Sequence, residues 1–173
     1  EALDDMGVDI IEAGFPISSN GDFEAVKAVG GILKSAVLCG LSRAALKDID
    51  RCAEAIRAAH RKRIHTFIST SPIHMKHKLQ MEPDQVLDAI QASVSHARKF
   101  TDDVEWSAED ATRTERDFLA RCVEIAIKAG ATTINLPDTV GYSFPEEYGA
   151  MFAQIIALVP GSDKVIFSVH FHN

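Results

Sequence analysis

The sequence contains little cysteine and no long apolar run. Its three cysteines, Cys39, Cys52 and Cys122, lie far apart and form no Cys-x-x-Cys pair. This spacing argues against a disulfide framework and favours a reducing compartment. No apolar stretch approaches the ~20 residues that span a bilayer, and no signal-peptide pattern stands at the start. We therefore expect a cytoplasmic protein without a membrane partner.

Basic charge and nucleotide-binding motifs are also scarce. With 18 Lys and Arg against 25 Asp and Glu, the formal net charge is -7, which argues against a nucleic-acid partner. The one basic cluster, residues 60–63, is short, lacks aromatic neighbours and is interpreted as a solvated helix end. No Gly-x-Gly-x-x-Gly or phosphate-loop motif is present. The 173 residues, 46% of them apolar, suffice for one domain with a sizeable core.

Short apolar runs alternate with helical segments along the chain. Strands are expected at residues 8–11, 36–38, 64–69, 104–107, 132–136 and 164–169. Helices are expected at about 22–29, 46–59, 83–100, 114–129 and 145–159, with Asp22 as the first N-cap, Pro83 in a first turn and Gly130 as a stop. Because a helix separates each pair of strands, the strands should be parallel and joined by right-handed crossovers.

The polar residues favour a closed barrel over an open doubly wound sheet. The chemically interesting residues stand at strand ends on four different strands: Ser69, Ser107, Glu109, Asp138, Thr139, His170 and His172. An open sheet concentrates its site at one switch point, whereas a barrel gathers residues from many strands around one rim. We predict an α/β fold of the (β/α)8 TIM-barrel type. A complete barrel takes ~250 residues, so residues 1–173 should form a single catalytic-barrel segment.

Two histidines near the end of the sequence are candidate metal ligands. Because side chains alternate along a strand, His170 and His172 should share one face while Val169 and Phe171 take the other. Two neutral imidazoles form half of a divalent-metal site that needs oxygen ligands. A pair of hydrogen-bonded strand histidines is the alternative. Oxygen-rich completion favours Mg²⁺ or Mn²⁺, and Zn²⁺ stays open.

Further polar residues stand at the ends of two other strands. Ser107 shares a strand face with Glu105, and Glu109 should follow in the loop just beyond. A solvated serine and an exposed glutamate are the simpler interpretation. Thr139 follows Asp138, where sequence alone favours a turn or an N-cap.

Two more histidines and one glutamate complete the candidates. His65 shares a strand face with Phe67 and Ser69, although a lone strand histidine is more often a satisfied core residue. His74 should lie in a loop, where a surface histidine is an equally good interpretation. Glu12 stands at a strand end and is interpreted as barrel packing or an ion pair.

Seven ordered segments carry a resemblance to a known family. They are residues 12–16 (EAGFP), 21–24 (GDFE), 65–68 (HTFI), 71–74 (SPIH), 107–110 (SAED), 137–142 (PDTVGY) and 170–173 (HFHN). The chain resembles the bacterial 2-isopropylmalate synthase family over its whole length. That family belongs to a superfamily of metal-dependent barrel enzymes that make or break carbon–carbon bonds. The resemblance implies that the six strands are strands 2 to 7, the first and last strands being absent.

The resemblance implies a Claisen condensation of acetyl-CoA with 2-oxoisovalerate to 2-isopropylmalate, in leucine biosynthesis. It implies that His170 and His172 are metal ligands. The family's Asp and Asn ligands and its substrate-binding Arg would lie outside this chain. It further implies that Ser107, Thr139, His65 and His74 contact the oxo acid, and that Glu109 assists the enolisation of acetyl-CoA as the catalytic residue. The full-length enzyme is expected to be a homodimer.

Glu105 bears on the choice of substrate. Homocitrate synthases, which resemble the chain elsewhere, carry an Arg here for the second carboxylate of 2-oxoglutarate, which a Glu would repel. A substrate with an apolar side chain fits better, while pyruvate, the citramalate synthase substrate, stays open. A lyase of the same superfamily and a catalytically silent fragment also stay open as hypotheses. Because half of the ligands are absent, we expect the isolated chain to bind metal weakly and to turn over nothing.

Overall fold

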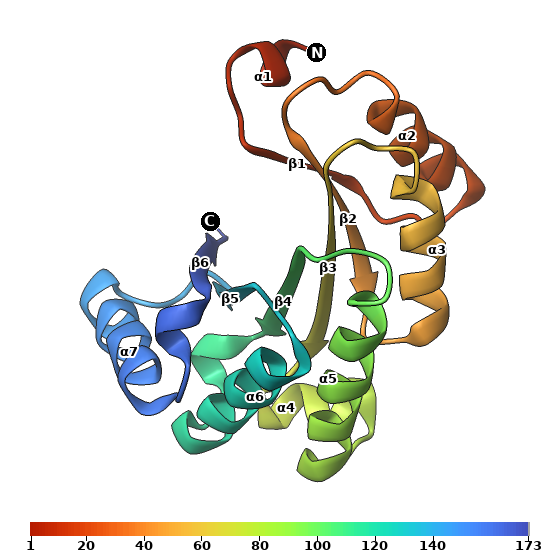
Figure 1. Cartoon of the computed structure of the whole chain (residues 1–173). Helices are drawn as coiled ribbons and strands as arrows, with labels where there is room; N and C mark the ends of the chain where they lie inside the picture. The colour runs from red at the N-terminus through yellow and green to blue at the C-terminus, as the bar shows by residue number, and fades with distance from the viewer. Residues whose placement is uncertain (173) are drawn as a thin grey trace.

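Within residues 1–172, six parallel strands form one curled sheet. The computed structural model describes residues 1–172. Neighbouring strands pair in sequence order: β1 (Ile10–Gly14), β2 (Val37–Arg43), β3 (Lys62–Ser69), β4 (Val104–Glu109), β5 (Thr133–Asp138) and β6 (Ile166–Phe171). Figure 1 shows the sheet curling as a half-barrel, with β1 and β6 as its outermost strands. The expected α/β fold with parallel strands is confirmed.

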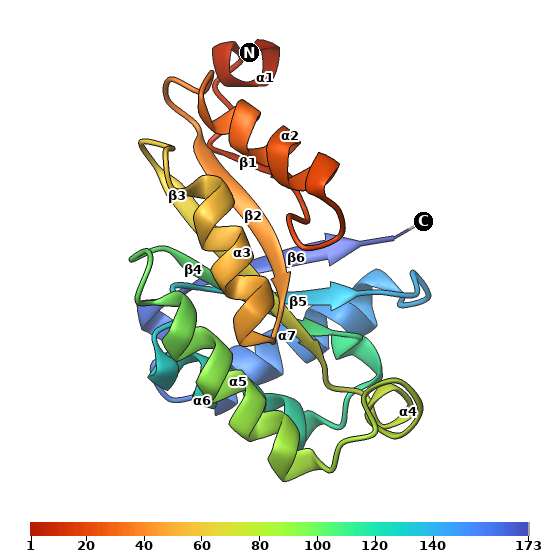
Figure 2. The ribbon, with the colours of Figure 1, turned by 90° about the vertical axis from the view of Figure 1, so that its right-hand side faces the viewer.

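The long helices cover the convex face of the sheet. They are α2 (Asn20–Gly30), α3 (Leu46–Ile56), α5 (Pro83–Ala97), α6 (Arg116–Ala129) and α7 (Pro145–Leu158). Each contacts the next in this order, and Figure 2 shows α2, α3 and α5 in front of the strands. Within residues 1–172, no helix has the length and apolar character that crossing a membrane requires. Because the long helices all pack on the convex face, they leave the concave face of the sheet uncovered.

Short helical pieces connect the larger elements, and one of them corrects an expectation. The chain begins with α1 (Ala2–Asp5), and single turns stand at Ala111–Arg113 and Ser162–Lys164. After β3, α4 (Pro72–His74) continues into a π-helical turn at Met75–Leu79. His74 thus belongs to a helix and not to the expected loop. Pro72 occupies the first turn of α4, a position where its missing N–H costs no hydrogen bond.

One expected helix end is wrong and two are confirmed. The N-cap of α2 is Ser19 and not Asp22, because the Ser19 hydroxyl accepts the Asp22 N–H at 3.0 Å. Asp22 instead accepts hydrogen bonds from the hydroxyls of Ser18 and Ser19 at 2.7 and 2.5 Å. Pro83 stands in the first turn of α5, and Gly130 ends α6 with a φ of 110°, as expected.

The hydrophobic core lies between the sheet and its helices. Trp106 and Ala108 of β4 are fully buried there, in the same cluster as Leu119 of α6. Because strand residues alternate, Glu105 and Ser107 face the opposite, concave side. The core packing of one strand face therefore sets which polar side chains line the concave face.

Candidate active site on the concave face

A chain of hydrogen bonds crosses the concave face from β1 to β5. His65 of β3 lies with Nδ1 2.5 Å from Glu12 Oε2 and with Nε2 2.6 Å from Ser107 Oγ. Asn135 of β5 donates its Nδ2–H to Ser107 Oγ at 2.8 Å. Since a carboxylate only accepts, Nδ1 carries the proton that Glu12 receives. Ser107 then donates its hydroxyl hydrogen to His65 Nε2, which gives every member of the chain a consistent role.

The neighbours of Glu12 lower the pKa of its carboxyl group. Burial by itself raises the pKa of Glu12, but the hydrogen bond and charge of His65 outweigh it and hold that pKa below its ordinary value. Smaller contributions that lower the same pKa come from the Cys39 thiol and from the charge of His170. Glu12 therefore stays a carboxylate and fixes the orientation of His65. The expectation that Glu12 forms an ion pair stays a prediction, because His65 carries a charge only when it is protonated.

The Glu12–Cys39–His65 cluster offers three potential metal ligands whose donor atoms lie within 4.8 Å of one another. The 2.5 Å between Glu12 and His65 is a hydrogen-bond length, whereas two ligands on a tetrahedral ion with ~2.1 Å bonds lie ~3.4 Å apart. Burial also raises the pKa of the Cys39 thiol well above its usual value, with the charge of Glu12 adding to the effect. The cluster thus fits a hydrogen-bonded network better than a metal centre.

The two histidines of β6 and its end lie side by side. Their ring centroids are 4.8 Å apart, and both side chains are exposed. Phe171 points the other way and packs on Tyr148 of α7 at 4.6 Å between ring centroids. His170 and His172 therefore share the concave face, as strand geometry requires. Their role as metal ligands stays a prediction, and Asn173 lies outside the described residues.

Glu109 stands on β4 itself and not in the loop beyond it. Lys78 Nζ lies 2.7 Å from both carboxylate oxygens of Glu109, and Ser69 donates its hydroxyl hydrogen to Oε2 at 2.5 Å. Lys78 comes from the π-helical turn after α4, a feature often found at functional sites. These three residues line a cavity of about 410 Å³ together with Phe67 of β3 and Leu79 of the π-helical turn. Sequence reasoning missed Lys78 because nothing in its neighbourhood predicts this turn.

His74 and Thr139 meet a different residue, the buried Asp110. His74 Nδ1 lies 2.9 Å from Asp110 Oδ2, and Thr139 Oγ1 accepts the Asp110 N–H at 2.9 Å. Arg113 also donates to both carboxylate oxygens. Burial raises the pKa of Asp110, but the hydrogen bonds from Arg113, Ser71 and His74 outweigh it and lower that pKa. Asp110 thus ties the loop after β5 and α4 to the end of β4.

Arg63 forms an ion cluster on the concave face, nearer to the start of β3 than His65. It donates from Nε to Asp103 Oδ1 and from Nη1 to Glu105 Oε2, each at 2.9 Å. Glu105 Oε1 also lies 4.0 Å from His65 Nε2. The interpretation of residues 60–63 as a solvated helix end is wrong for Arg63, which is buried and belongs to β3. Its place two residues before His65 puts both side chains on one face of the strand.

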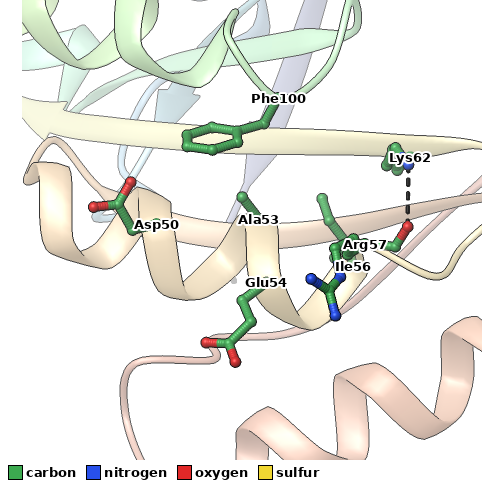
Figure 3. A pocket seen from close by; sticks show the side chains of 7 residues that line it. All are labelled: Asp50, Ala53, Glu54, Ile56, Arg57, Lys62 and Phe100. Carbon is green, nitrogen blue, oxygen red and sulfur yellow. Dashed lines mark hydrogen bonds between the residues drawn. The ribbon is translucent and has the colours of Figure 1, made fainter.

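Another cavity, of about 260 Å³, lies on the outer side of the sheet. Figure 3 shows its lining residues from α3 and two neighbouring segments: Asp50, Ala53, Glu54, Ile56, Arg57, Lys62 and Phe100. Lys62 Nζ donates there to the Arg57 carbonyl at 3.2 Å. None of the candidate site residues lines this cavity, so the candidate chemistry belongs to the concave face.

Both sequence and fold have known counterparts. The model of the HMGL-like family matches residues 1–173. Over 171 residues the chain is 72% identical to a 2-isopropylmalate synthase of Caulobacter vibrioides and 69% identical to one of Bradyrhizobium sp.. Each match covers 99% of this chain and 33% of the relative, so the chain spans about a third of these relatives' length.

Solved lyase structures share the fold. The hydroxymethylglutaryl-CoA lyase from Pseudomonas aeruginosa matches with a TM-score of 0.75 at 17% identity, over 98% of this chain and 58% of that chain. The HMG-CoA lyase from Brucella melitensis matches with a TM-score of 0.74 at 20% identity, over 98% and 61%. At this identity the likeness concerns the fold alone. It supports a TIM-barrel-like half-barrel, while the numbering of the strands as 2 to 7 stays a prediction.

Proposed function

The chain belongs to the HMGL-like family, and from this premise we propose that its protein condenses acetyl-CoA with 2-oxoisovalerate to 2-isopropylmalate. The observation that supports this proposal most is the concave-face network of Glu12, His65 and Ser107, in a chain 72% identical to a 2-isopropylmalate synthase. The protein would be an acyltransferase of leucine biosynthesis, placed in the cytoplasm and acting as a homodimer. The lyase alternative is supported only by likenesses of 17–20% identity, which concern the fold.

A divalent ion would be held by His170 and His172. The two imidazoles are exposed and their ring centroids lie 4.8 Å apart, which lets a nitrogen of each ring bind the same ion. Mg²⁺ or Mn²⁺ fits best if the remaining ligands are oxygens, with Zn²⁺ as the alternative. When bound, such an ion supplies Lewis acidity at the ketone of the oxo acid.

The oxo acid would be oriented by His65, Ser107 and Thr139. The Ser107 hydroxyl and the His65 ring occupy the middle of the concave face, where their hydrogen bonds can be exchanged for bonds to the substrate. Thr139 Oγ1 accepts a bond from Asp110, so its own hydroxyl hydrogen is available to a substrate carboxylate. His74 uses Nδ1 at Asp110 and would offer Nε2 from the rim.

Glu109 would act in the enolisation of acetyl-CoA. Lys78 and Ser69 hold its carboxylate in place at the end of β4. As a general base, the carboxylate would accept a proton from the acetyl methyl group. The resulting enolate carbon would attack the ketone of the oxo acid, and the alkoxide formed there would take up a proton. Water would then cleave the thioester to a carboxylic acid and release CoA as a thiol.

The test uses the full-length enzyme from the parent gene. Thiol release from acetyl-CoA is measured with 2-oxoisovalerate, pyruvate and 2-oxoglutarate, with and without EDTA. We expect 2-oxoisovalerate to give the highest kcat/KM and EDTA to abolish the activity until Mg²⁺ or Mn²⁺ is restored. Preference for pyruvate would reassign the enzyme to citramalate synthesis. Absence of thiol release with all three acids would refute the proposal.

A further inference from the structure

The ion cluster of Arg63, Asp103 and Glu105 lies on the concave face next to the proposed substrate site. In β3 and β4, His65 and Glu105 occupy paired positions in the strand register. The side chains of Arg63 and Glu105 are only 9% and 13% exposed, whereas Asp103 is 34% exposed. The cluster therefore forms a largely buried floor beneath His65.

The charges of this floor do not cancel. One guanidinium is shared by two carboxylates, which leaves one excess negative charge. Arg63 has five N–H donors, and its two bonds go from Nε to Asp103 and from Nη1 to Glu105. A substrate carboxylate that reached the floor would meet Glu105 before Arg63 and would have to displace an intramolecular partner.

We propose that Arg63 is a latent carboxylate-binding residue and that Glu105 masks it, so that this pair restricts the site to 2-oxo acids without a distal carboxylate. The inference rests on the proposed function and adds the residue that decides its substrate class. Without the Glu105 carboxylate, Arg63 retains Asp103 alone and the cluster becomes neutral. The donors formerly directed at Glu105 then face the space below His65.

The same contacts are compatible with a floor that only stabilises the fold. In that case, removing Glu105 changes stability and the kcat/KM for every substrate alike. The masking hypothesis instead predicts a change in the ratio of kcat/KM between two substrates. That ratio is insensitive to the amount of folded enzyme, because both substrates are turned over by the same molecules.

The experiment measures thiol release by the full-length enzyme with 2-oxoisovalerate and with 2-oxoglutarate as the dicarboxylic probe. In Glu105→Ala, we expect the kcat/KM ratio of 2-oxoglutarate to 2-oxoisovalerate to rise roughly 10- to 100-fold, the range for one charged hydrogen bond. Glu105→Gln should raise it less, because the amide oxygen still accepts from Arg63. Asp103→Asn is the matched control: it removes the charge of the other partner but leaves Glu105 in place, so the ratio should stay within about 2-fold.

The double variant Arg63→Met/Glu105→Ala identifies the residue that binds the new carboxylate. The gain must disappear in it; a gain that persists, or no gain in folded Glu105→Ala, overturns the proposal. If Glu105→Ala does not fold, Glu105→Met decides, because it keeps the length of the side chain without the carboxylate that accepts from Arg63; an unchanged ratio in it overturns the proposal. Wild-type enzyme without activity on 2-oxoisovalerate would instead contradict the proposed function, so the two failures are distinct.

Discussion

The bond between Glu12 and His65 gives the most direct test of the concave-face network. Replacing Glu12 with Gln keeps the size of the side chain but removes its charge. The Gln amide can then donate to His65 Nδ1, which favours the tautomer with the proton on Nε2. In that tautomer Nε2 no longer accepts from Ser107, and the order of donors along Glu12, His65, Ser107 and Asn135 reverses or breaks.

The size of the effect follows from the contact. A hydrogen bond to a charged group contributes roughly 1.5–3 kcal/mol. The Glu12 side chain is 42% exposed, so solvent screening reduces this to about 1–2 kcal/mol. At about 1.4 kcal/mol per factor of ten, the full-length Glu12→Gln enzyme should lose about 5- to 30-fold in kcat/KM for 2-oxoisovalerate. Cys39→Ser, which keeps a small donor beside Glu12, should lose less than about 3-fold.

Two measurements decide this prediction. Thiol release gives kcat/KM, and ¹⁵N NMR of the imidazole gives the tautomer, which a purely structural role of Glu12 would leave unchanged. Because the folded pKa of Glu12 is lowered, its contribution to stability is present above the ordinary value of 4.5 and is lost as pH falls through the folded value. Glu12→Gln should therefore differ from wild type most at neutral pH. A variant with wild-type kcat/KM and an unchanged tautomer would refute the reasoning.

Three further predictions concern other parts of the site. Lys78→Met should lower kcat at least about 10-fold, because Glu109 loses its charged anchor, and Lys78→Arg should restore part of it; equal kcat in wild type and Lys78→Met would contradict the role of Lys78. Asp110→Asn, which tolerates the φ of 67°, should destabilise the enzyme at neutral pH in urea unfolding. Since the folded pKa of Asp110 is lowered, this difference should shrink as pH falls through that value, and a pH-independent difference would exclude the carboxylate as its cause. The isolated 173-residue chain should bind Mg²⁺ or Mn²⁺ weakly, and a tight one-to-one calorimetric titration would show that His170 and His172 need no further ligands from outside it.

Local patterns predicted the elements better than they predicted the contacts between them. The apolar run at 64–69 and the alternation at 104–107 correctly place His65 and Ser107 on strands. Strand periodicity also gives their shared face. The register that brings His65 beside Glu105, however, depends on the pairing of β3 with β4 across a helix. No local signal encodes such a register, so the sequence could not show that Arg63 donates to Glu105.

The turn after β3 was missed for a different reason. Residues 71–80 contain Pro72 and a mixture of polar and apolar residues without a clear period, so a loop was the natural interpretation. In the structure the turn is held by tertiary bonds, among them His74 to Asp110 and Lys78 to Glu109. Here long-range contacts override the local secondary-structure preference, and they place Lys78 beside Glu109 at the end of β4.

The influence of His170 on Glu12 depends on the curvature of the sheet. The two residues stand on β6 and β1, the outermost strands of a six-stranded sheet. At ~4.8 Å per strand, five steps along a flat sheet separate them by ~24 Å, far beyond the ~8 Å over which salt screens exposed charges. Yet the charge of His170 helps to hold the pKa of Glu12 below its ordinary value. The sheet curls as a half-barrel, so β6 lies nearer to β1 than it would in a flat sheet, and the same curl turns the face of β6 that carries the proposed metal ligands toward β1.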